Sequence, residues 1–368
     1  SMGGIITYAP EDMYITVGAG TSLTGVQSFL AEHGQQIPLA SPWPGTTVGG
    51  LAATNMNAPL RMSYGAIRDL VLCATVVLAD GRIIRAGRPV IKNVAGFDLV
   101  KLFVGSYGTL GLLADITLKV SARPRQRRSL IIPVDDLRHG LMWARRLYPI
   151  SLAASAIVLG RSDSVLRFTR NMQDSDEGSD SRNLQGNQDI LKNHPYVLMY
   201  TAEGLAEDVQ AELRQVREVM RVTEAAGVEA KEPVEIDDIS GTDVWAHFLG
   251  RAGDAVQVRV GVPVRDLPVY VQDQSALLTS EDFLVDFASG FVYCLLTMQG
   301  DGDLPRTIER LRAPALQVGG YAIVMHEPAG WRGRQDRWGY KPDTLDLMRG
   351  LKARWDPARI LGAGSFVV

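Results

Sequence analysis

A glycine-rich stretch, KNVAGFDLVKLFVGSYGTLGLL from Lys92 to Leu113, constrains the fold more than any other feature of this sequence. It sets Gly96, Gly105, Gly108 and Gly111 among many apolar residues. An uninterrupted core helix would not contain this pattern, because each interior glycine costs about 1 kcal/mol relative to alanine. We therefore expect the backbone here to lie very close to another group, either a neighbouring element or a bound ligand.

A second loop of similar composition is ASPWPGTTVGGLAATNMNAP, residues 40–59. It is long and irregular, which is typical of functional loops, and its apolar content argues against disorder. Successive backbone N–H groups in such loops can bind an anion. Two such loops in one domain predict a site for a dinucleotide or another phosphate-bearing, partly aromatic ligand. Tight packing of helix against strand is the alternative explanation for Gly96 and Gly111 and, less so, for Gly49-Gly50.

Other nucleotide-binding motifs fit less well. Gly18 and Gly20 follow a strand-like run and precede a helix-like one, as in GxGxxG, but Leu23 occupies the third glycine position. The sequence also has no Walker lysine pattern and no acidic cluster that would hold magnesium. These observations favour a dinucleotide bound without a metal over a Rossmann fold or a triphosphate site.

Composition excludes several further classes. The 368 residues suffice for two or three domains, and a net charge of −3 does not indicate a nucleic-acid partner. We expect no membrane span, no signal peptide and a cytoplasmic location. Cys73 and Cys294 are too few for an iron–sulfur cluster and are expected to be buried, reduced thiols. The five histidines lack metal-ligand spacing, so we expect no metal site.

The first 120 residues or so read as mixed α and β. Strands are expected at Met13–Val17 and Gly111–Val120, and helices at Leu23–His33 and Phe97–Phe103. Between them, two β-rich runs flank Asp80-Gly81, which favours a hairpin with a type I′ turn.

After the basic, proline-bearing junction at 122–128, strand-like and helix-like runs alternate. This predicts an α+β domain with an antiparallel sheet and helices on one face. The expected strands are Ser129–Val134, Ala154–Leu159, Val165–Phe168, Val197–Tyr200, Val256–Val260, Phe283–Phe287 and Phe291–Met298. The expected helices are Leu137–Leu147, Glu207–Ala225, Asp243–Leu249, Pro268–Leu278, Leu304–Leu311 and Pro342–Trp355. We interpret the polar segment near 172–193 as a surface insertion.

Five blocks, in this order, carry a family resemblance: PGTTVGGLAATN, YGAIRDLVL, VVLADGRIIRAG, KNVAGFDLVKLFVGSYGTLGLL and LKARWDPARILGAGSF. They resemble the FAD-linked oxidases of the PCMH-type or vanillyl-alcohol-oxidase superfamily, most of all the FAD-binding E subunit of glycolate oxidase. D-lactate dehydrogenases are similar but more distant. The resemblance is tight over residues 3–124, loose over 125–340, and returns in the C-terminal tail.

The resemblance implies three parts. Residues 1–124 would form a PCMH-type FAD-binding domain, N-terminally incomplete because relatives carry a further glycine-rich segment before this point. Residues 125–340 would form an α+β cap domain. Residues 341–368 would form a helix and tail that pack back on the FAD domain.

The resemblance also implies the residues of the cofactor site. FAD would be bound non-covalently, since Trp43 and Pro44 stand where some relatives carry the Cys or His that attaches it. The implied cofactor-binding residues are Pro44, Gly45, Thr46, Thr47, Gly49, Gly50, Ala53, Thr54, Asn55, Tyr64, Gly65, Asp69, Asn93, Gly96, Gly105, Gly108, Thr109, Gly111 and Leu112.

Three residues are candidates for catalysis. His326 is the candidate general base, because related dehydrogenases use histidines of the cap domain. Arg68 and Lys92 would hold a substrate carboxylate or the flavin edge that becomes anionic on reduction. The alternatives are a strand-end histidine with one hydrogen bond, and structural ion pairs such as Arg68 with Asp69 or Asp98.

The function implied by the resemblance is that of an FAD-dependent oxidoreductase subunit. A 2-hydroxy acid of the glycolate or D-lactate type would give a hydride to the flavin. The electrons would pass to an iron–sulfur subunit in a complex that also holds a sister FAD subunit and provides any contact with a membrane. Two alternatives remain open: a flavin-free scaffold subunit or fragment of such a complex, and a stand-alone D-lactate-type dehydrogenase.

Overall fold

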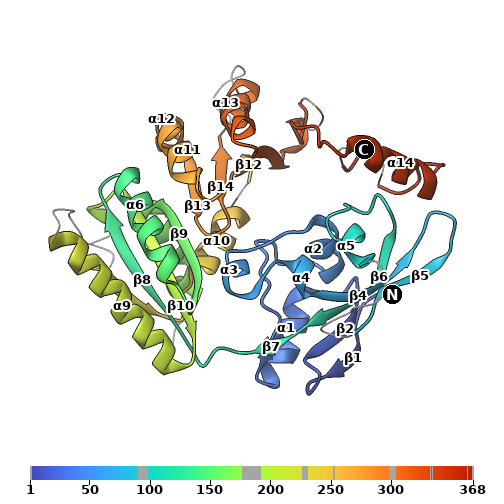
Figure 1. Ribbon diagram of the computed structural model, residues 1–368, viewed down its shortest axis with the longest axis horizontal. Coiled ribbons are helices and arrows are strands. Elements are labelled where there is room, and N and C mark those ends of the chain that lie inside the picture. The colour runs from blue at the N-terminus through green and yellow to red at the C-terminus, as the bar shows by residue number, and fades with distance from the viewer. Residues whose placement is uncertain are drawn as a thin grey trace. The chain divides into compact units, whose positions relative to one another are not determined.

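The protein consists of two compact units, Ser1–Arg123 together with Lys341–Val368, and Pro124–Tyr340 (Figure 1). The computed structural model describes residues 2–89, 98–175, 192–225, 231–251, 253–297, 304–331, 333, 335–362 and 364–366. The first unit is therefore built from both ends of the chain, and the second is inserted between them.

A five-stranded sheet in the order β1-β2-β6-β4-β5 forms the centre of the first unit, and every neighbouring pair is antiparallel. Its strands are β1 (Ile5–Ala9), β2 (Tyr14–Gly18), β4 (Val71–Val77), β5 (Ile83–Gly87) and β6 (Leu112–Lys119). Fully buried side chains such as Ile15, Val76 and Ile116 fill its core. A separate two-stranded pair is formed by β3 (Gln35–Gln36) and β7 (Ser121–Ala122). Along the chain, β3 follows α1 and β7 follows β6.

The helices of this unit are short. They are α1 (Leu23–Glu32), α2 (Val48–Thr54), α3 (Arg61–Tyr64), α4 (Ile67–Leu70), α5 (Val100–Phe103) and α14 (Leu345–Trp355). Helix α1 begins at Ser22, whose side chain accepts a hydrogen bond from the Gly25 N–H, and it buries Leu23, Val26 and Leu30. Helix α5 covers only the second half of the expected 97–103 helix, and Phe97 lies outside the described residues.

The predicted hairpin at Asp80-Gly81 is confirmed, but its turn is not type I′. A type I′ turn requires positive φ at both central residues, and here φ is +83° at Gly81 but is not positive at Asp80. The Leu78 N–H donates to the Arg82 carbonyl and the Gly81 N–H to the Leu78 carbonyl, which defines a three-residue loop. Asp80 stabilises this loop by accepting the Arg82 N–H at 3.0 Å.

The second unit contains an eight-stranded antiparallel sheet in the order β11-β8-β10-β9-β13-β14-β12-β15. The predicted α+β class with an antiparallel sheet is confirmed. The strands are β8 (Gln126–Val134), β9 (Ala154–Arg161), β10 (Tyr196–Gly204), β11 (Val234–Asp237), β12 (Val256–Gly261), β13 (Asp282–Asp286), β14 (Phe291–Leu296) and β15 (Tyr321–His326). The helices are α6 (Leu137–Leu147), α7 (Ser162–Ser175), α9 (Ala206–Ala225), α10 (Gly241–Gly250), α11 (Leu267–Asp273), α12 (Ser275–Ser280) and α13 (Leu304–Gln317), with 3-10 turns at Tyr148–Ile150 and Ala329–Trp331.

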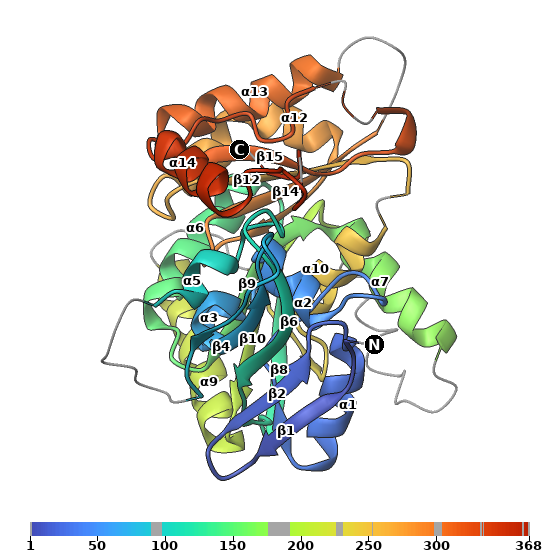
Figure 2. The ribbon, with the colours of Figure 1, turned by 90° about the vertical axis from the view of Figure 1, so that its right-hand side faces the viewer.

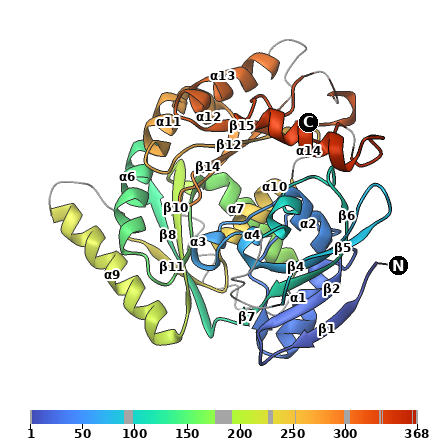
Figure 3. The same cartoon turned by 45° about the vertical axis from the view of Figure 1, so that its right-hand side comes forward.

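Helices lie on both faces of this sheet, so the expectation of a single helical face was wrong. Figures 2 and 3 show α6 and α9 on one side of β8–β10 and α7 and α10 on the other. The segment Val165–Phe168, expected as a strand, belongs to helix α7. A four-residue run with three apolar residues has no decisive periodicity, and here Val165, Leu166 and Phe168 are buried on one side of a helix while Arg167 is exposed.

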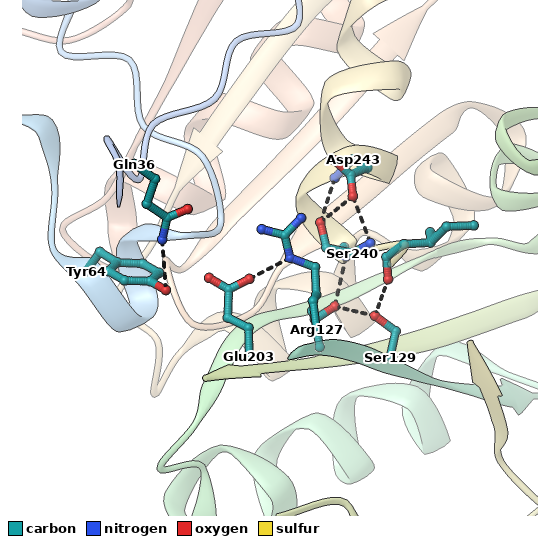
Figure 4. A network of polar contacts seen from close by, with 10 residues as sticks. Gln36, Tyr64, Arg127, Ser129, Glu203, Ser240 and Asp243 are labelled. Atoms are coloured by element: carbon teal, nitrogen blue, oxygen red, sulfur yellow. Dashed lines mark hydrogen bonds and ion pairs between the residues drawn. The ribbon is translucent and has the colours of Figure 1, made fainter. Parts of the chain in front are cut away.

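Buried hydrogen bonds fix the start of α10 on the sheet (Figure 4). The Ser129 hydroxyl lies 2.8 Å from that of Thr201, which accepts the Gly241 N–H at 2.9 Å. Ser240 and Asp243 form a reciprocal capping box at the first turn. Because Ser129, Thr201 and Ser240 are buried, the register of α10 relative to β8 and β10 is well defined.

Candidate functional site

The two glycine-rich loops predicted from the sequence meet in the first unit at helix α2. Thr47 caps this helix, and its Oγ1 accepts the Gly50 N–H at 3.1 Å. The first turn lies against the loop after β2, where the Gly49 N–H donates to the Ala19 carbonyl at 2.8 Å. A Cβ on Gly49 would lie 2.7 Å from that carbonyl oxygen, so close packing by itself requires this glycine.

The second loop is held at the other end of α2. The Gly105 N–H donates to the Ala52 carbonyl at 2.9 Å, and the Tyr107 N–H to the Ala53 carbonyl at 2.8 Å. Gly105 and Gly108 have φ of +81° and +70°, a region in which glycine has no steric penalty. The loop therefore turns back along α2 and places its backbone beside the helix.

Between these segments lies a cavity of about 430 Å³, a volume within the usual range for small-molecule sites. Most of the residues that line it are glycine, alanine or other small residues. The lining consists of Met2, Ala19, Gly20, Thr47, Gly49, Gly50, Ala53, Ser106, Tyr107, Gly108, Gly111, Leu112, Leu113, Ile360, Leu361 and Gly362. Seven of the residues predicted to bind the cofactor are among them: Thr47, Gly49, Gly50, Ala53, Gly108, Gly111 and Leu112.

Ten other predicted cofactor residues do not line this cavity, and several of them support its walls instead. They are Pro44, Gly45, Thr46, Thr54, Asn55, Tyr64, Gly65, Asp69, Gly105 and Thr109. Asn55 ends α2 in a left-handed conformation with φ 50°, and the Asp69 carboxylate accepts the Ala66 N–H at 3.0 Å. The Tyr64 hydroxyl accepts a hydrogen bond from the Gln36 amide (Figure 4). Asn93 and Gly96 lie outside the described residues.

Two glycines of the second loop have different roles. A Cβ on Gly111 would lie 2.5 Å from Val76 Cγ1, so this glycine is required by packing against β4. A Cβ on Gly108 would meet no atom within 4 Å, although Gly108 lines the cavity. The space beside Gly108 is therefore open to a ligand. Together with the small residues around it, Gly108 forms a cavity wall against which a flat ring can lie on the backbone.

Sequence reasoning missed part of the lining. Ala19 and Gly20 lie in the GAG stretch, residues 18–20, which was considered from the sequence only as an incomplete GxGxxG motif. Ile360, Leu361 and Gly362 come from the far end of the sequence, and only the resemblance of the tail pointed to this region. A local glycine pattern gives no information about which distant segment closes a cavity.

The candidate catalytic residues are not brought together by either unit. Arg68 is exposed on α4, and its carbonyl accepts a hydrogen bond from Lys101 Nζ. His326 is the last residue of β15 in the second unit, paired with Gln257 of β12. Lys92 lies outside the described residues, so the catalytic roles of all three residues stay predictions.

The second unit contains a polar cluster that the sequence did not indicate. The guanidinium of Arg259, on β12, lies 5.1 Å from the ring centre of Phe291 and 5.7 Å from that of Tyr321. Burial raises the pKa of the neighbouring Tyr293 hydroxyl; the Arg259 charge opposes this rise and the Asp286 carboxylate adds to it. This part of the eight-stranded sheet therefore contains the Arg259 cation, the Asp286 carboxylate and the Tyr293 phenol.

A larger open pocket of about 1150 Å³ also lies in the second unit. Arg167 and Arg251 both approach Asp282 Oδ2 in its wall, at 3.3 Å and 3.4 Å. Burial lowers the pKa of Arg251, as does the charge of Arg167, while Asp282 raises it. Four carboxylates and three guanidiniums line this pocket, so it does not favour one sign of charge.

Among the residues that the structure describes, no three His, Cys, Asp or Glu side chains come together as a metal site would require. None of the helices in this part of the chain combines the length and apolarity needed to cross a bilayer.

Comparison with known proteins identifies the kind of domain that forms this site. Residues 1–87 match the family described as FAD binding domain. Over 129 residues the chain is 42% identical to the glycolate oxidase subunit GlcE of Escherichia coli (strain K12), a match that covers 34% of this chain and 37% of that subunit. It is 26% identical to a D-lactate dehydrogenase of Anaerostipes hadrus, over 99% of this chain and 78% of that enzyme.

Solved structures show the same fold. An alkyldihydroxyacetonephosphate synthase superposes with a TM-score of 0.68 at 15% identity, over 98% of this chain and 65% of that one. The 4-ethylphenol oxidase of Gulosibacter chungangensis, in its isoeugenol complex, gives a TM-score of 0.68 at 12% identity, over 99% of this chain and 78% of that one. The predicted PCMH-type fold, the resemblance to FAD-linked oxidases and FAD as the cofactor are thereby confirmed.

Proposed function

We propose that this chain, which carries an FAD-binding domain of the FAD-linked oxidase type, is a flavoprotein subunit. Its proposed substrate is a 2-hydroxy acid of the glycolate or D-lactate class, which it would oxidise. The observation that carries the proposal is the small-residue cavity of the first unit, formed partly by segments that match the FAD binding domain family. The names of the relatives, a glycolate oxidase subunit and D-lactate dehydrogenases, support the substrate class.

The residues of the cavity would bind and orient the cofactor. Thr47 and Gly50, at the start of α2, would lie along one side, where their small side chains leave room for the cofactor. Gly108 would accept a ring against its backbone, since no protein atom occupies that space. When bound, FAD supplies an acceptor for two electrons and a proton from the hydroxy acid, which becomes a 2-oxo acid.

Three residues are proposed to act on the substrate. We propose His326 as general base, and Arg68 and Lys92 as ligands for the substrate carboxylate, on the strength of the resemblance alone. The half-buried Arg259 is a further cation suited to a carboxylate, because aromatic rings on either side hold its guanidinium in a fixed place.

We also propose that the electrons pass to an iron–sulfur subunit, in a complex with a sister FAD subunit. The subunit names of two relatives, GlcE and the GlcD of Bacillus subtilis (strain 168), support an assembly of several chains. The chain has two cysteines, Cys73 and Cys294, both buried in separate units, so a cluster would have to be held by another subunit. The cytoplasmic location stays a prediction.

The test begins with an absorption spectrum of the purified chain after incubation with FAD and removal of free cofactor. A bound flavin spectrum that bleaches anaerobically with glycolate or D-lactate, but not with L-lactate, is the expected result. A bound flavin that none of the hydroxy acids bleaches would remove the substrate assignment. Absence of bound flavin would instead favour the scaffold alternative.

A second measurement separates the subunit from a stand-alone enzyme. Turnover of D-lactate with an artificial electron acceptor is measured with the isolated chain. Slow turnover that rises when partner subunits are added is expected. Rapid turnover without any partner would favour the stand-alone D-lactate-type dehydrogenase.

A further inference from the structure

Aromatic contacts hold the C-terminal tail, residues 355–366, against the glycine loop of the cavity. Trp355 stacks on Phe103 with ring centres 5.8 Å apart and an interplanar angle of 28°. Phe366 stacks on Tyr107 at 5.4 Å and 12°. Tyr107 itself has φ 53°, an unfavourable region for a side chain of this size, and it lines the cavity. The tail therefore contacts the loop on both sides of Gly105.

A buried ion pair fixes the middle of the tail. Lys352 Nζ contacts the Asp356 carboxylate and donates to the carbonyls of Leu361, at 2.7 Å, and Thr109, at 2.8 Å. The Asp356 carboxylate in turn accepts the N–H groups of Ile360 at 3.0 Å and Leu361 at 2.9 Å. Lys352 is 8% exposed and Asp356 0%, so one buried pair joins α14, the turn after it and the loop.

The turn held in this way is part of the cavity wall. Ile360, Leu361 and Gly362 line the cavity. Gly362 has φ +51°, and a Cβ there would lie 3.1 Å from the Tyr107 carbonyl oxygen, so the tail is as close to the loop as its backbone allows. The Ile360 side chain is nevertheless 66% exposed. An apolar side chain with a fixed backbone and an exposed surface beside a ligand cavity is suited to cover a bound aromatic group.

We propose that the segment Ile360–Gly362 is a third wall of the cofactor site that contacts bound FAD, and that Lys352 and Asp356 are positioning residues that hold this wall in place. The inference rests on the proposed function and extends it to a segment about 270 residues beyond the part that matches the FAD binding domain. Retention of FAD thus depends on residues that reach the first unit only after the chain has passed through the second.

The test compares two substitutions of exposed apolar residues in the same C-terminal region. Ile360→Asp places a carboxylate on the cavity wall, while Leu347→Asp places one on α14 at a residue that is 75% exposed and does not line the cavity. Neither replaces a buried side chain, so both proteins should fold. We expect Ile360→Asp to weaken FAD binding about tenfold, through lost apolar contact and the cost of placing a charge against an aromatic group, and Leu347→Asp to leave it unchanged.

Hydrogen exchange measured by mass spectrometry provides a readout that does not depend on activity. In the wild-type chain, saturating FAD should slow exchange of the amides of residues 355–362. Lys352→Met should speed exchange of the Ile360 and Leu361 amides, whose acceptor is Asp356, while β4 keeps its protection. Loss of protection throughout the first unit in Lys352→Met would show a general structural role and contradict the positioning role.

The outcomes separate this inference from the proposed function. If wild-type chain binds no FAD, both fail. If FAD binds, yet the tail amides exchange at the same rate with and without it and the two Asp variants bind FAD equally, the tail is not a wall of the site and the proposed function stands. Slower tail exchange together with weaker binding only in Ile360→Asp supports both.

Discussion

Replacing Gly108 with alanine tests directly whether the cavity of the first unit accepts a ligand. The added Cβ would meet no protein atom within 4 Å, so the substitution changes the cavity without disturbing its walls. It does place a side chain at φ +70°, which costs roughly 1–2 kcal/mol for an L-residue. Part of this cost is offset by about 0.4–1 kcal/mol, because alanine restricts the unfolded chain more than glycine does.

Gly81 provides a matched control. It has φ +83° in the β4–β5 turn, a Cβ there would also meet no atom within 4 Å, and it does not line the cavity. Gly81→Ala and Gly108→Ala should therefore lose a similar stability of about 1 kcal/mol, seen as a fall of roughly 2 °C in the thermal midpoint. Any difference between them in FAD binding reports on the cavity.

The two variants should differ clearly in affinity for FAD. A methyl group in the path of a bound ring is an overpacking defect of about 1–3 kcal/mol, which corresponds to a Kd about 5 to 150 times higher. The larger β-branched side chain in Gly108→Val should abolish retention while the protein stays soluble. Flavin fluorescence titration measures both variants. Equal Kd values for Gly108→Ala, Gly81→Ala and wild type would refute the assignment of Gly108 to the ligand site.

Three further predictions concern the second unit. Glu212→Ala should lower the free energy of unfolding by about 2 kcal/mol, measured by urea titration, because the buried Tyr200 hydroxyl loses its acceptor at about 1–3 kcal/mol and the Leu152 and Ala153 N–H groups lose two partly buried hydrogen bonds; a loss no larger than that of Tyr200→Phe would contradict this. Gly261→Ala would place a Cβ 2.6 Å from Tyr321 Cζ and should cost about 1–3 kcal/mol, with Tyr321→Ala in the same chain restoring most of the thermal midpoint; no recovery in the double variant would exclude the clash as the cause. Burial raises the pKa of the Glu281 carboxyl above its ordinary value of 4.5, and the Thr297 N–H only partly opposes this. Protonated Glu281 therefore contributes stability that is fully present below pH 4.5 and is lost as the pH rises through the raised pKa. Glu281→Gln, which stays neutral, should raise the thermal midpoint at pH 7 but not at pH 4. Equal shifts of the midpoint at both pH values would argue against a titrating Glu281.

Local sequence signals predicted much of the secondary structure. The hairpin at Asp80-Gly81 and helix α6 followed from turn chemistry and helical periodicity, which act over a few residues. The turn type was wrong because two-residue and three-residue loops share the same Asp-Gly signal, and only the register of the strands decides between them. Val165–Phe168 was assigned to a strand because a short run with three apolar residues fits either period.

Long-range features were less accessible. The helix at Asp243–Leu249 was predicted, but its place on a second face of the eight-stranded sheet was not, because α10 follows the same apolar pattern as a helix on the first face would. The site was predicted as two glycine loops, whereas its lining also includes Ala19 and the turn at Ile360–Gly362. Segments so distant in sequence are brought together by the sheet of the first unit and by the buried Lys352–Asp356 pair. No local sequence pattern indicates which distant segments these two features join.

Glycine shows most clearly why composition points to a site without defining it. Gly49, Gly111 and Gly108 all lie in the glycine-rich loops and all line the same cavity. A Cβ would meet the Ala19 carbonyl in the first case and Val76 in the second, so these two residues are fixed by the packing of the protein against itself. Only Gly108 leaves unoccupied space, and packing does not require it to be small. Because loss of FAD in a Gly49 or Gly111 variant would follow from a displaced α2 or β4 in any case, Gly108 is the position at which a glycine substitution separates ligand binding from folding.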